Sequence, residues 1–425
     1  MLLPVKPRLL KMQYAVKQVA GILLLEYLGT LLEPLFGTGQ GSGASPAIWL
    51  ALVVILLNSL DRLSQEYQIP GLEFHDPWDE LLEAWQVGAF VDDTNKGVLD
   101  PGGVLSMDDL VEAMRSAGQL WENLLNISGG CLNLAKCSWT VQYWTWINGR
   151  PSLLPIHASD PPLIMTSGRN PEQHIIQQHA NTTELKGLGV YMNFAGTFSA
   201  HAKTMRFKFD AMARRLQRSS MSAVLSRVYY NTFYLPAVRY SLPVTSMLAP
   251  DLHRVQSLMT ATILNKLGYN SHYPHAVAFA PKHVFGLGLI DLRIEQGLTH
   301  VQAMLDYVGT DHKVGRVMLI SLRHLQLEAG VSFDILRQPD VPLVYLTDSW
   351  VTSLRGFCAE YNVSLSVMRN RLPTAAREGD KMLMDVALTL GLTKRELMDL
   401  NLIRIYMQAT TVSDIAMADG LTIHP

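Results

Sequence analysis

Two adjacent carboxylates, Asp92 and Asp93, are the strongest candidates for metal chemistry in this sequence. The apolar residues 85–91 before them predict a strand, residues 92–95 its turn, and residues 97–99 the returning strand. Carboxylate oxygens at the tip of a hairpin are the hard ligands that Mg²⁺ prefers. Two metal ions held there would activate an attacking hydroxyl and stabilise the leaving group in nucleotidyl transfer. An ordinary acidic β-turn is the alternative, and on spacing alone it is the more common one.

A second set of candidates is a local run of cations between residues 201 and 227. The whole chain carries 35 Lys and Arg against 37 Asp and Glu, so its net charge of −2 does not by itself indicate a nucleic-acid binder. Within the run, the cations are opposed by one acid, Asp210. On a helix they would either hold nucleic-acid phosphates, a contact that weakens with salt, or form an ordinary solvated face. The cations are Lys203, Arg206, Lys208, Arg214, Arg215, Arg218 and Arg227.

The aromatic, histidine and cysteine residues give weaker signals. Four aromatic side chains, at positions 229, 230, 233 and 234, follow the cations; they could stack on bases, but a cluster facing a hydrophobic core is favoured. The histidines at 174, 179 and 201 do not form a credible metal set. Three cysteines are too few for a disulfide framework, which favours a reducing, intracellular compartment. We expect Cys131 to pack in the interior.

Helix signals frame these candidates. Ser45 fits the N-cap of a helix and Pro46 its first position. The eleven apolar residues 47–57 are too few to cross a bilayer, which needs about 20, so we expect a buried core helix there. Residues 106–109, Ser-Met-Asp-Asp, have the form of a capping box at the start of another helix. Residues 1–34 are expected to be helical and basic, with no convincing secretion signal.

Strand signals occupy the middle of the chain, where residues 138–198 are expected to form β structure with loops. Asn148-Gly149 predicts a hairpin turn, because both residues tolerate the positive φ that this turn requires. Residues 185–192 have the pattern of another strand or hairpin. From residue 199 onward, long helical patterns divided by prolines continue to the C-terminal end. Together these elements predict an α+β fold.

Four short motifs resemble those of reverse transcriptases and follow the order found in that family. Phe90-Val91-Asp92-Asp93 resembles the aromatic-x-Asp-Asp box. Residues 39–46, Gly-Gln-Gly-Ser-Gly-Ala-Ser-Pro, resemble the preceding palm motif. Residues 129–136 resemble the next motif, which ends in a lysine, and Leu188-Gly189-Val190 resembles the primer-grip hairpin. The motif sequences most resemble those of the polymerases of LINE-like (non-LTR) retrotransposons. The helical tail of those polymerases is similar to residues 240–243, 286–292 and 402–415.

The resemblance implies roles for the residues around the acidic pair. Asp92 would be the principal ligand of Mg²⁺ or Mn²⁺, and Asp93 the second ligand or its neighbour. Gln40 and Gly41 would lie against the templating base and the incoming nucleotide, where a glycine backbone lets a base pair approach closely. A flexible glycine-rich loop is the alternative for this stretch. Phe90 would pack beneath the catalytic turn.

Other residues would contact phosphates or the primer. Lys136 would neutralise phosphate charge or donate a proton to pyrophosphate, although a solvated surface lysine fits nearly as well. Gly189 would allow a tight hairpin near the primer end, and an ordinary β-turn is the alternative. A helix of the thumb would hold primer–template phosphates through Lys203, Arg206, Arg214, Arg215 and Arg218.

The implied architecture is a partial reverse transcriptase palm over residues 1–198, with an antiparallel sheet and packed helices. A thumb-like helical region over residues 199–300 and a helical C-terminal region over residues 301–425 would follow. The implied partners are an RNA template, a DNA primer and deoxynucleotides, with no membrane. The implied activity is RNA-directed DNA polymerisation by two-metal nucleotidyl transfer.

The chain departs from the family in one important respect. A working polymerase needs a further Asp on a palm strand upstream of the Gln-Gly motif, and this sequence has no Asp before Asp61. We therefore expect the C-terminal part of a reverse transcriptase, lacking the first palm motif and inactive alone. The alternatives are a non-catalytic nucleic-acid-binding protein and a helical interaction protein.

Overall fold

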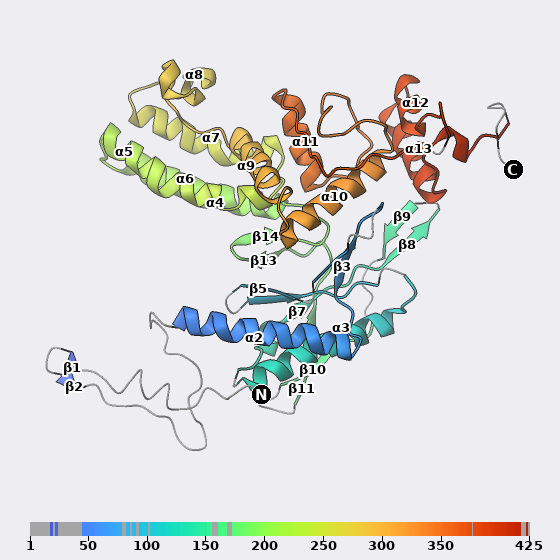
Figure 1. The fold of residues 1–425 in the computed structure, drawn as a ribbon. Coiled ribbons are helices and arrows are strands. Elements are labelled where there is room, and N and C mark those ends of the chain that lie inside the picture. Colours follow the sequence, from blue (N-terminus) through green and yellow to red (C-terminus); the bar gives the residue numbers. More distant parts are fainter. Residues whose placement is uncertain are drawn as a thin grey trace. The chain divides into compact units, whose positions relative to one another are not determined.

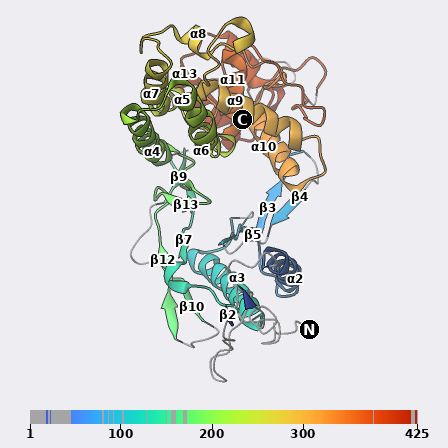
Figure 2. The same cartoon turned by 90° about the vertical axis from the view of Figure 1, so that its left-hand side faces the viewer.

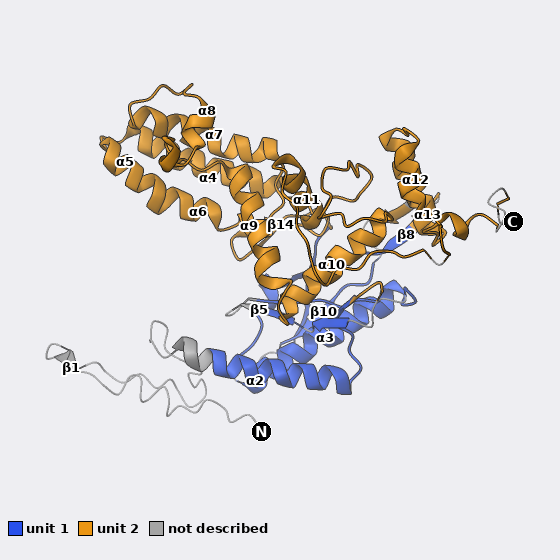
Figure 3. Cartoon of the chain, turned by 45° about the horizontal axis from the view of Figure 1, so that its top comes forward, with its two compact units in different colours: residues 1–74, 82–145, 153–180 blue, residues 75–81, 146–152, 181–425 orange. Residues whose placement is uncertain are grey.

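Helices and short two-stranded sheets make up the chain, which confirms the α+β class expected from the sequence (Figure 1). The computed structural model describes residues 18–19, 22–23, 45–78, 82–85, 87–90, 93–100, 103–128, 130–148, 150–154, 160–167, 172–375, 377–417 and 422–423. The chain divides into two compact units (Figure 3). Unit 1 comprises residues 1–74, 82–145 and 153–180, and unit 2 comprises residues 75–81, 146–152 and 181–425.

Two packed helices form one side of unit 1. Helix α2 (Ser45–Glu66) begins one residue before Pro46, the predicted first position, and α3 (Met107–Ile127) begins directly after Ser106. Leu56 and Leu60 of α2 are fully buried against α3, but Leu50 is 64% exposed. The apolar run therefore buries one face only, and the expectation of a core helix is wrong for the other face. Within the described ranges, no helix has the combination of length and apolarity that crossing a bilayer requires.

The start of α3 confirms the predicted capping box. The Ser106 hydroxyl accepts the Asp109 backbone N–H, and the Asp109 carboxylate accepts the Ser106 backbone N–H. Such a cap contributes about 1 kcal/mol because it satisfies N–H groups that the first turn leaves open. Further along α3, the Gln119 amide exchanges two hydrogen bonds of 3.0 Å with the Thr166 backbone. These bonds attach α3 to strand β10, and Val111 of α3 and Met165 of β10 share one hydrophobic cluster.

The strands of the N-terminal half pair as short ladders. Hydrogen-bonded pairs are β1 (Gln18–Val19) with β2 (Ile22–Leu23), β3 (Leu72–His75) with β4 (Leu82–Trp85), β5 (Val87–Phe90) with β6 (Asp93–Lys96), β8 (Trp144–Ile147) with β9 (Arg150–Leu153), β10 (Ile164–Thr166) with β11 (Gln173–Ile175), and β7 (Ser138–Trp139) with β12 (Gln177–Gln178). Asn148 has φ +50°, which confirms the predicted hairpin turn. The β1–β2 pair shows that the helical expectation for residues 1–34 is wrong at its four described residues.

The longest segment of unit 2, residues 181–425, starts with a hairpin and continues as helices. The hairpin is β13 (Leu185–Gly187) and β14 (Val190–Met192). The helices are α4 (Ser199–Arg218), α5 (Ala223–Tyr229), the π-helical turn η2 (Tyr230–Tyr234), α6 (Leu235–Arg239), α7 (Ala249–Lys266), α8 (His275–Phe279), α9 (Leu292–Tyr307), α10 (Lys313–Ala329), α11 (Trp350–Glu360), α12 (Leu383–Thr389) and α13 (Lys394–Tyr406). Short 3₁₀ turns are η1 (Leu134–Lys136, in unit 1), η3 (Leu242–Val244), η4 (Lys282–Val284) and η5 (Val412–Asp414).

The interior of unit 2 holds two hydrophobic clusters, one from residues 202–292 and one from residues 304–397. Helix α9 contributes Leu292 to the first and Met304 to the second, so the predicted boundary between residues 300 and 301 falls inside one helix. In the first cluster, Tyr230 and Tyr234 are buried, and the Phe209 ring meets Tyr234 edge to face with 5.4 Å between ring centroids. The core-facing interpretation of the aromatic cluster is correct for these two tyrosines, whereas Phe233 is exposed.

Candidate nucleic-acid interface

The hairpin that carries the acidic pair forms in unit 1, with a different register from the predicted one. Strands β5 and β6 are antiparallel, and Phe90 pairs with Asp93. The return strand therefore begins at Asp93, and the prediction that it begins at residue 97 is wrong. Asp92 and the side chains of Phe90 and Asp93 lie outside the described residues, as do Gln40 and Gly41.

The described residues contain no group of three or more His, Cys, Asp or Glu side chains that could hold a metal ion. Because the side chains of the acidic pair are outside this description, the Mg²⁺ site stays a prediction. The hairpin does hold a residue that the sequence argument missed. Lys96 pairs with Val87, and its ammonium nitrogen is buried without a hydrogen-bond partner. Burial lowers the pKa of Lys96 to about 8, and the charge of Asp61 opposes this shift.

Lys136 is the last residue of the 3₁₀ turn η1 and is exposed. Its surface position is compatible with both interpretations of this lysine, the phosphate contact and the plain solvated cation. Cys131 lies just before this turn and is also exposed, so the expectation that it packs in the interior is wrong.

The predicted primer-grip segment forms a tight hairpin in unit 2. Gly187 pairs with Val190, which leaves a two-residue loop of Leu188 and Gly189. Both loop residues have positive φ, +50° and +84°, as a type I′ turn requires. Glycine at the second position adopts this conformation without a steric penalty, because it has no Cβ. The hairpin is therefore confirmed, and its contact with a primer stays a prediction.

Two hydrogen bonds attach this hairpin to the helices of unit 2. The Tyr240 hydroxyl donates to the Leu188 carbonyl at 2.7 Å. The Tyr191 backbone N–H donates to Nδ1 of His201, in the first turn of α4, at 3.2 Å. Burial, with a smaller effect from the charge of Lys208, lowers the pKa of His201 and keeps its ring a neutral acceptor. Figure 2 shows β13 directly below α4.

Helix α4 separates a buried apolar face from an exposed basic face. Its buried side chains include Met205, Phe209 and Leu216, and this face packs against α7. All five predicted phosphate-binding cations are exposed. Arg206 lies 3.9 Å from Asp210, and no ion pair involves the other four within the described part of the chain. The cations therefore keep their hydrogen-bonding capacity for an external acceptor.

An aromatic side chain stands among these cations. Phe207 is 81% exposed, although it belongs to a helix whose other large apolar residues face the core. It lies four residues after Lys203 and seven before Arg214, which puts all three on one face of the helix. An exposed ring between cations is the arrangement that stacks on a base while the cations hold phosphates. A helical-wheel plot of the sequence would have revealed this position.

The six predicted primer- and phosphate-binding residues thus belong to unit 2, where the hairpin and α4 are bonded to each other. Phe90, Asp93 and Lys136, which were assigned to the metal and nucleotide sites, belong to unit 1. The basic surface formed by Lys203, Arg206, Phe207, Arg214, Arg215, Arg218 and the β13–β14 turn is called the α4 face below.

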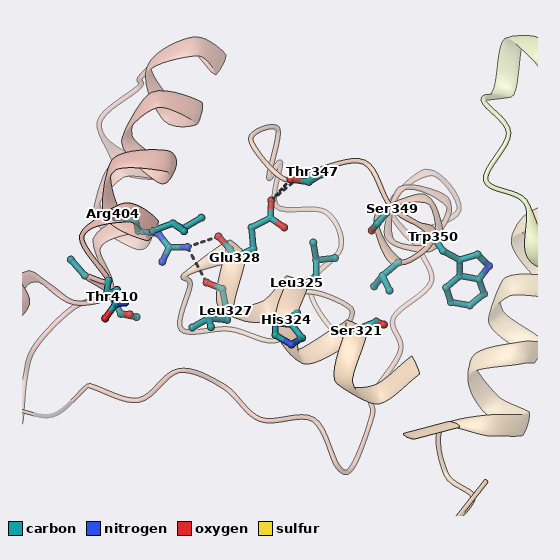
Figure 4. A pocket seen from close by; sticks show the side chains of 14 residues that line it. Ser321, His324, Leu325, Leu327, Glu328, Thr347, Ser349, Trp350, Arg404 and Thr410 are labelled. Atoms are coloured by element: carbon teal, nitrogen blue, oxygen red, sulfur yellow. Dashed lines mark hydrogen bonds between the residues drawn. The ribbon is translucent and has the colours of Figure 1, made fainter. Parts of the chain in front are cut away.

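A separate cavity of about 850 Å³ lies in the C-terminal part of unit 2 (Figure 4). Its walls come from α10, α11 and α13, and its charged groups bond within the fold. The Glu328 carboxylate accepts the backbone N–H and hydroxyl of Thr347, both at 2.7 Å. The Arg404 guanidinium donates to the carbonyl of Leu327 at 2.9 Å and to that of Glu328. No residue that the sequence assigned to a site lines this cavity.

Comparison with known proteins adds no further identification, because neither the scan of family models nor the search of curated proteins gives a match.

Proposed function

We propose that this chain is part of an RNA-directed DNA polymerase of the non-LTR retrotransposon type. In this proposal unit 2 holds a primer–template hybrid on the α4 face, and unit 1 carries the acidic hairpin of a palm. With only Asp92 and Asp93 as metal ligands, the chain does not polymerise by itself. The observation that carries the proposal is the α4 face, because its cations are exposed and four of them have no ion pair within the described residues.

Charge and shape support the nucleic-acid part of the proposal. A phosphate backbone needs donors that the protein does not already use, and arginine guanidinium groups supply them in a planar fork. Residues along one helix face follow a duplex groove without reading its sequence. The aromatic Phe207 adds a stacking surface, and strand β14 of the hairpin is attached to the same helix by the bond from Tyr191 to His201.

The register of the β5–β6 hairpin supports the proposed metal binding by the acidic pair. The first and last residues of the Phe-x-Asp-Asp motif, Phe90 and Asp93, pair with each other at the end of the β5–β6 ladder. Carboxylates at that position suit Mg²⁺ or Mn²⁺. Since a two-metal site uses more carboxylates than two, the proposal gives this chain weak metal binding and no catalysis alone.

Binding of a fluorescein-labelled RNA–DNA primer–template hybrid, followed by anisotropy from 50 to 300 mM salt, tests the nucleic-acid part. The proposal expects log K to fall linearly with log salt, with a slope of about −4 to −5 for five phosphate contacts. Affinity that does not change with salt would remove phosphate binding and leave the helical interaction protein as the better interpretation.

Mn²⁺ binding, followed by electron paramagnetic resonance in the presence of the hybrid, tests the metal part. Asp92→Asn should abolish the weak binding. Asp108→Asn, in the other Asp-Asp pair, is the matched control and should leave it unchanged. Equal binding by both variants would favour the non-catalytic nucleic-acid binder, whose support is the same α4 face. Primer extension by the chain alone with Mg²⁺ would contradict the proposed inactivity.

A further inference from the structure

A second basic site lies in unit 2, at a cavity of about 290 Å³ between α5, the end of α7 and the turn after α8. Two cations from separate elements, Arg227 and Lys282, line it, and no acidic residue does. Its other walls are Leu267, Tyr269 and the backbone around residues 286–287. The Tyr269 ring is held by the Tyr273 ring, with 4.7 Å between their centroids.

The turn that supplies Lys282 is fixed by its own backbone. The Gly286 N–H donates to the Pro281 carbonyl at 3.1 Å, and the Gly288 N–H donates to the Ala280 carbonyl at 2.9 Å. A Cβ on Gly286 would lie 1.9 Å from the Ala280 carbonyl oxygen, so only glycine permits this approach. The cavity wall is therefore preorganised rather than formed on binding.

The side chains of Arg227 and Lys282 both lie close to Gly288. A Cβ on Gly288, which has φ +60°, would lie 3.2 Å from Cγ of Lys282 and 3.7 Å from Nη2 of Arg227. Nη2 of Arg227 donates to the Leu287 carbonyl, which orients the guanidinium. Its Nη1 is buried and has no hydrogen-bond partner. The Arg227 guanidinium therefore keeps a donor that no acceptor of the fold uses.

The site adjoins the basic end of α4. Lys266, at the end of α7, donates to the carbonyl of Ser219, the residue that caps α4, at 2.5 Å. Leu267 follows Lys266 directly and lines the cavity. The last turns of α4 carry Arg214, Arg215 and Arg218.

We propose that this cavity binds a phosphate group, with Arg227 and Lys282 as its donors. A guanidinium fork and a lysine point charge on one side of a small cavity are complementary to a phosphate dianion or a phosphodiester. The phosphate comes either from the nucleic acid on the α4 face, which rests on the proposed function, or from a free phosphate ion, which does not.

Two titrations of the full chain test the proposal. Inorganic phosphate is titrated by calorimetry, with chloride as the reference anion, into the wild type, Lys282→Gln and Lys394→Gln. Lys394 is an exposed lysine at the start of α13 and serves as the control. We expect Lys282→Gln to weaken phosphate binding about tenfold, because one charge-assisted donor is lost, and Lys394→Gln to leave it unchanged. The same three proteins are then titrated with the RNA–DNA hybrid.

The hybrid titration identifies the source of the phosphate. If Lys282→Gln reduces the magnitude of the slope of log K against log salt by about 1, the cavity holds a phosphodiester of the bound strand. If Lys282→Gln weakens binding of inorganic phosphate, and either the slope is unchanged or the wild type does not bind the hybrid, the cavity is a free-phosphate site. If Lys282→Gln changes neither measurement, or if Lys394→Gln changes both equally, the proposal is overturned, whatever the hybrid does on the α4 face.

Discussion

Arginine has opposite roles in the two halves of unit 2. In the C-terminal half, Arg323, Arg355 and Arg404 are each at most 8% exposed, and their guanidinium groups donate to acceptors of the fold. The arginines at the end of α4 are exposed, and no acidic partner lies beside them within the described residues. A buried arginine that donates to acceptors of the fold stabilises the fold, whereas an exposed arginine without partners is free to bind an external anion. The difference separates arginines that bond within the fold from arginines that stay available to an external anion.

The largest expected effect concerns the ion pair of the C-terminal half. Nη1 of Arg323 lies 2.7 Å from the Asp76 carboxylate, and both side chains are buried. Arg323→Met would remove the buried guanidinium that pairs with the Asp76 carboxylate and lower the free energy of unfolding by about 3–5 kcal/mol. Urea unfolding measures this change. The double variant Arg323→Met/Asp76→Leu should recover most of the loss, and a loss below about 1 kcal/mol in the single variant would contradict the structural role.

His300 extends the comparison to a buried base that stays neutral. Its Nε2 is within hydrogen-bond distance of the carbonyls of Leu242 and Thr245, at 3.1 and 2.9 Å. Burial lowers the pKa of His300 to about 4, against an opposing effect of these carbonyls. The unfolded chain therefore binds the proton first, so the stabilisation is complete above about pH 6.5 and declines as the pH falls toward 4.

Between these pH values, the wild type should lose roughly 3 kcal/mol of unfolding free energy that His300→Gln does not lose. Urea unfolding at pH 6.5, 5 and 4 measures the difference. Parallel curves for the two proteins would show that His300 titrates normally in the folded state.

Lys96 is a buried cation without the partner that Arg323 has. Because burial lowers its pKa to about 8, the folded chain holds a charged amine at a cost below that pH. Lys96→Met should raise the free energy of unfolding by about 1–2 kcal/mol at pH 7, and the gain should shrink as the pH rises from 8 to 10.5. Thermal unfolding across this range is the measurement. Destabilisation by Lys96→Met would show that the lysine has a favourable contact.

Local chemistry made part of this structure predictable. The capping box at Ser106, the Asn148 turn and the Leu188–Gly189 turn each depend on a few neighbouring residues, and all three form as expected. The α+β class and the start of α2 follow from similar short-range signals. The basic face of α4 was also readable, because helical periodicity needs only residues of the same helix.

Long-range packing limited the rest. The partner of Arg323 is 247 positions away, so no local pattern could show that this arginine is buried and paired. The register of β5–β6 differs from the predicted one because two residues suffice for a tight turn, and the sequence favoured a longer one. The exposure of Leu50 on α2 and of Cys131 depends on which surfaces the neighbouring elements cover.

The smallest effect on stability should come from the α4 face. Replacing Arg218 by Gln should change the free energy of unfolding by less than about 0.5 kcal/mol, because the side chain is exposed and has no ion pair among the described residues. The same variant should weaken hybrid binding at low salt. Loss of stability without loss of binding would reverse the distinction between the two kinds of arginine.

The salt dependence of hybrid binding by Arg214→Gln/Arg215→Gln/Arg218→Gln tests the central claim most directly. The matched control replaces three exposed cations of the C-terminal half, Lys381, Lys394 and Arg395, by Gln. If the α4 face holds phosphates, the magnitude of the slope of log K against log salt should fall by about 3 in the α4 variant and stay unchanged in the control. An unchanged slope in the α4 variant, or an equal fall in the control, would contradict the account.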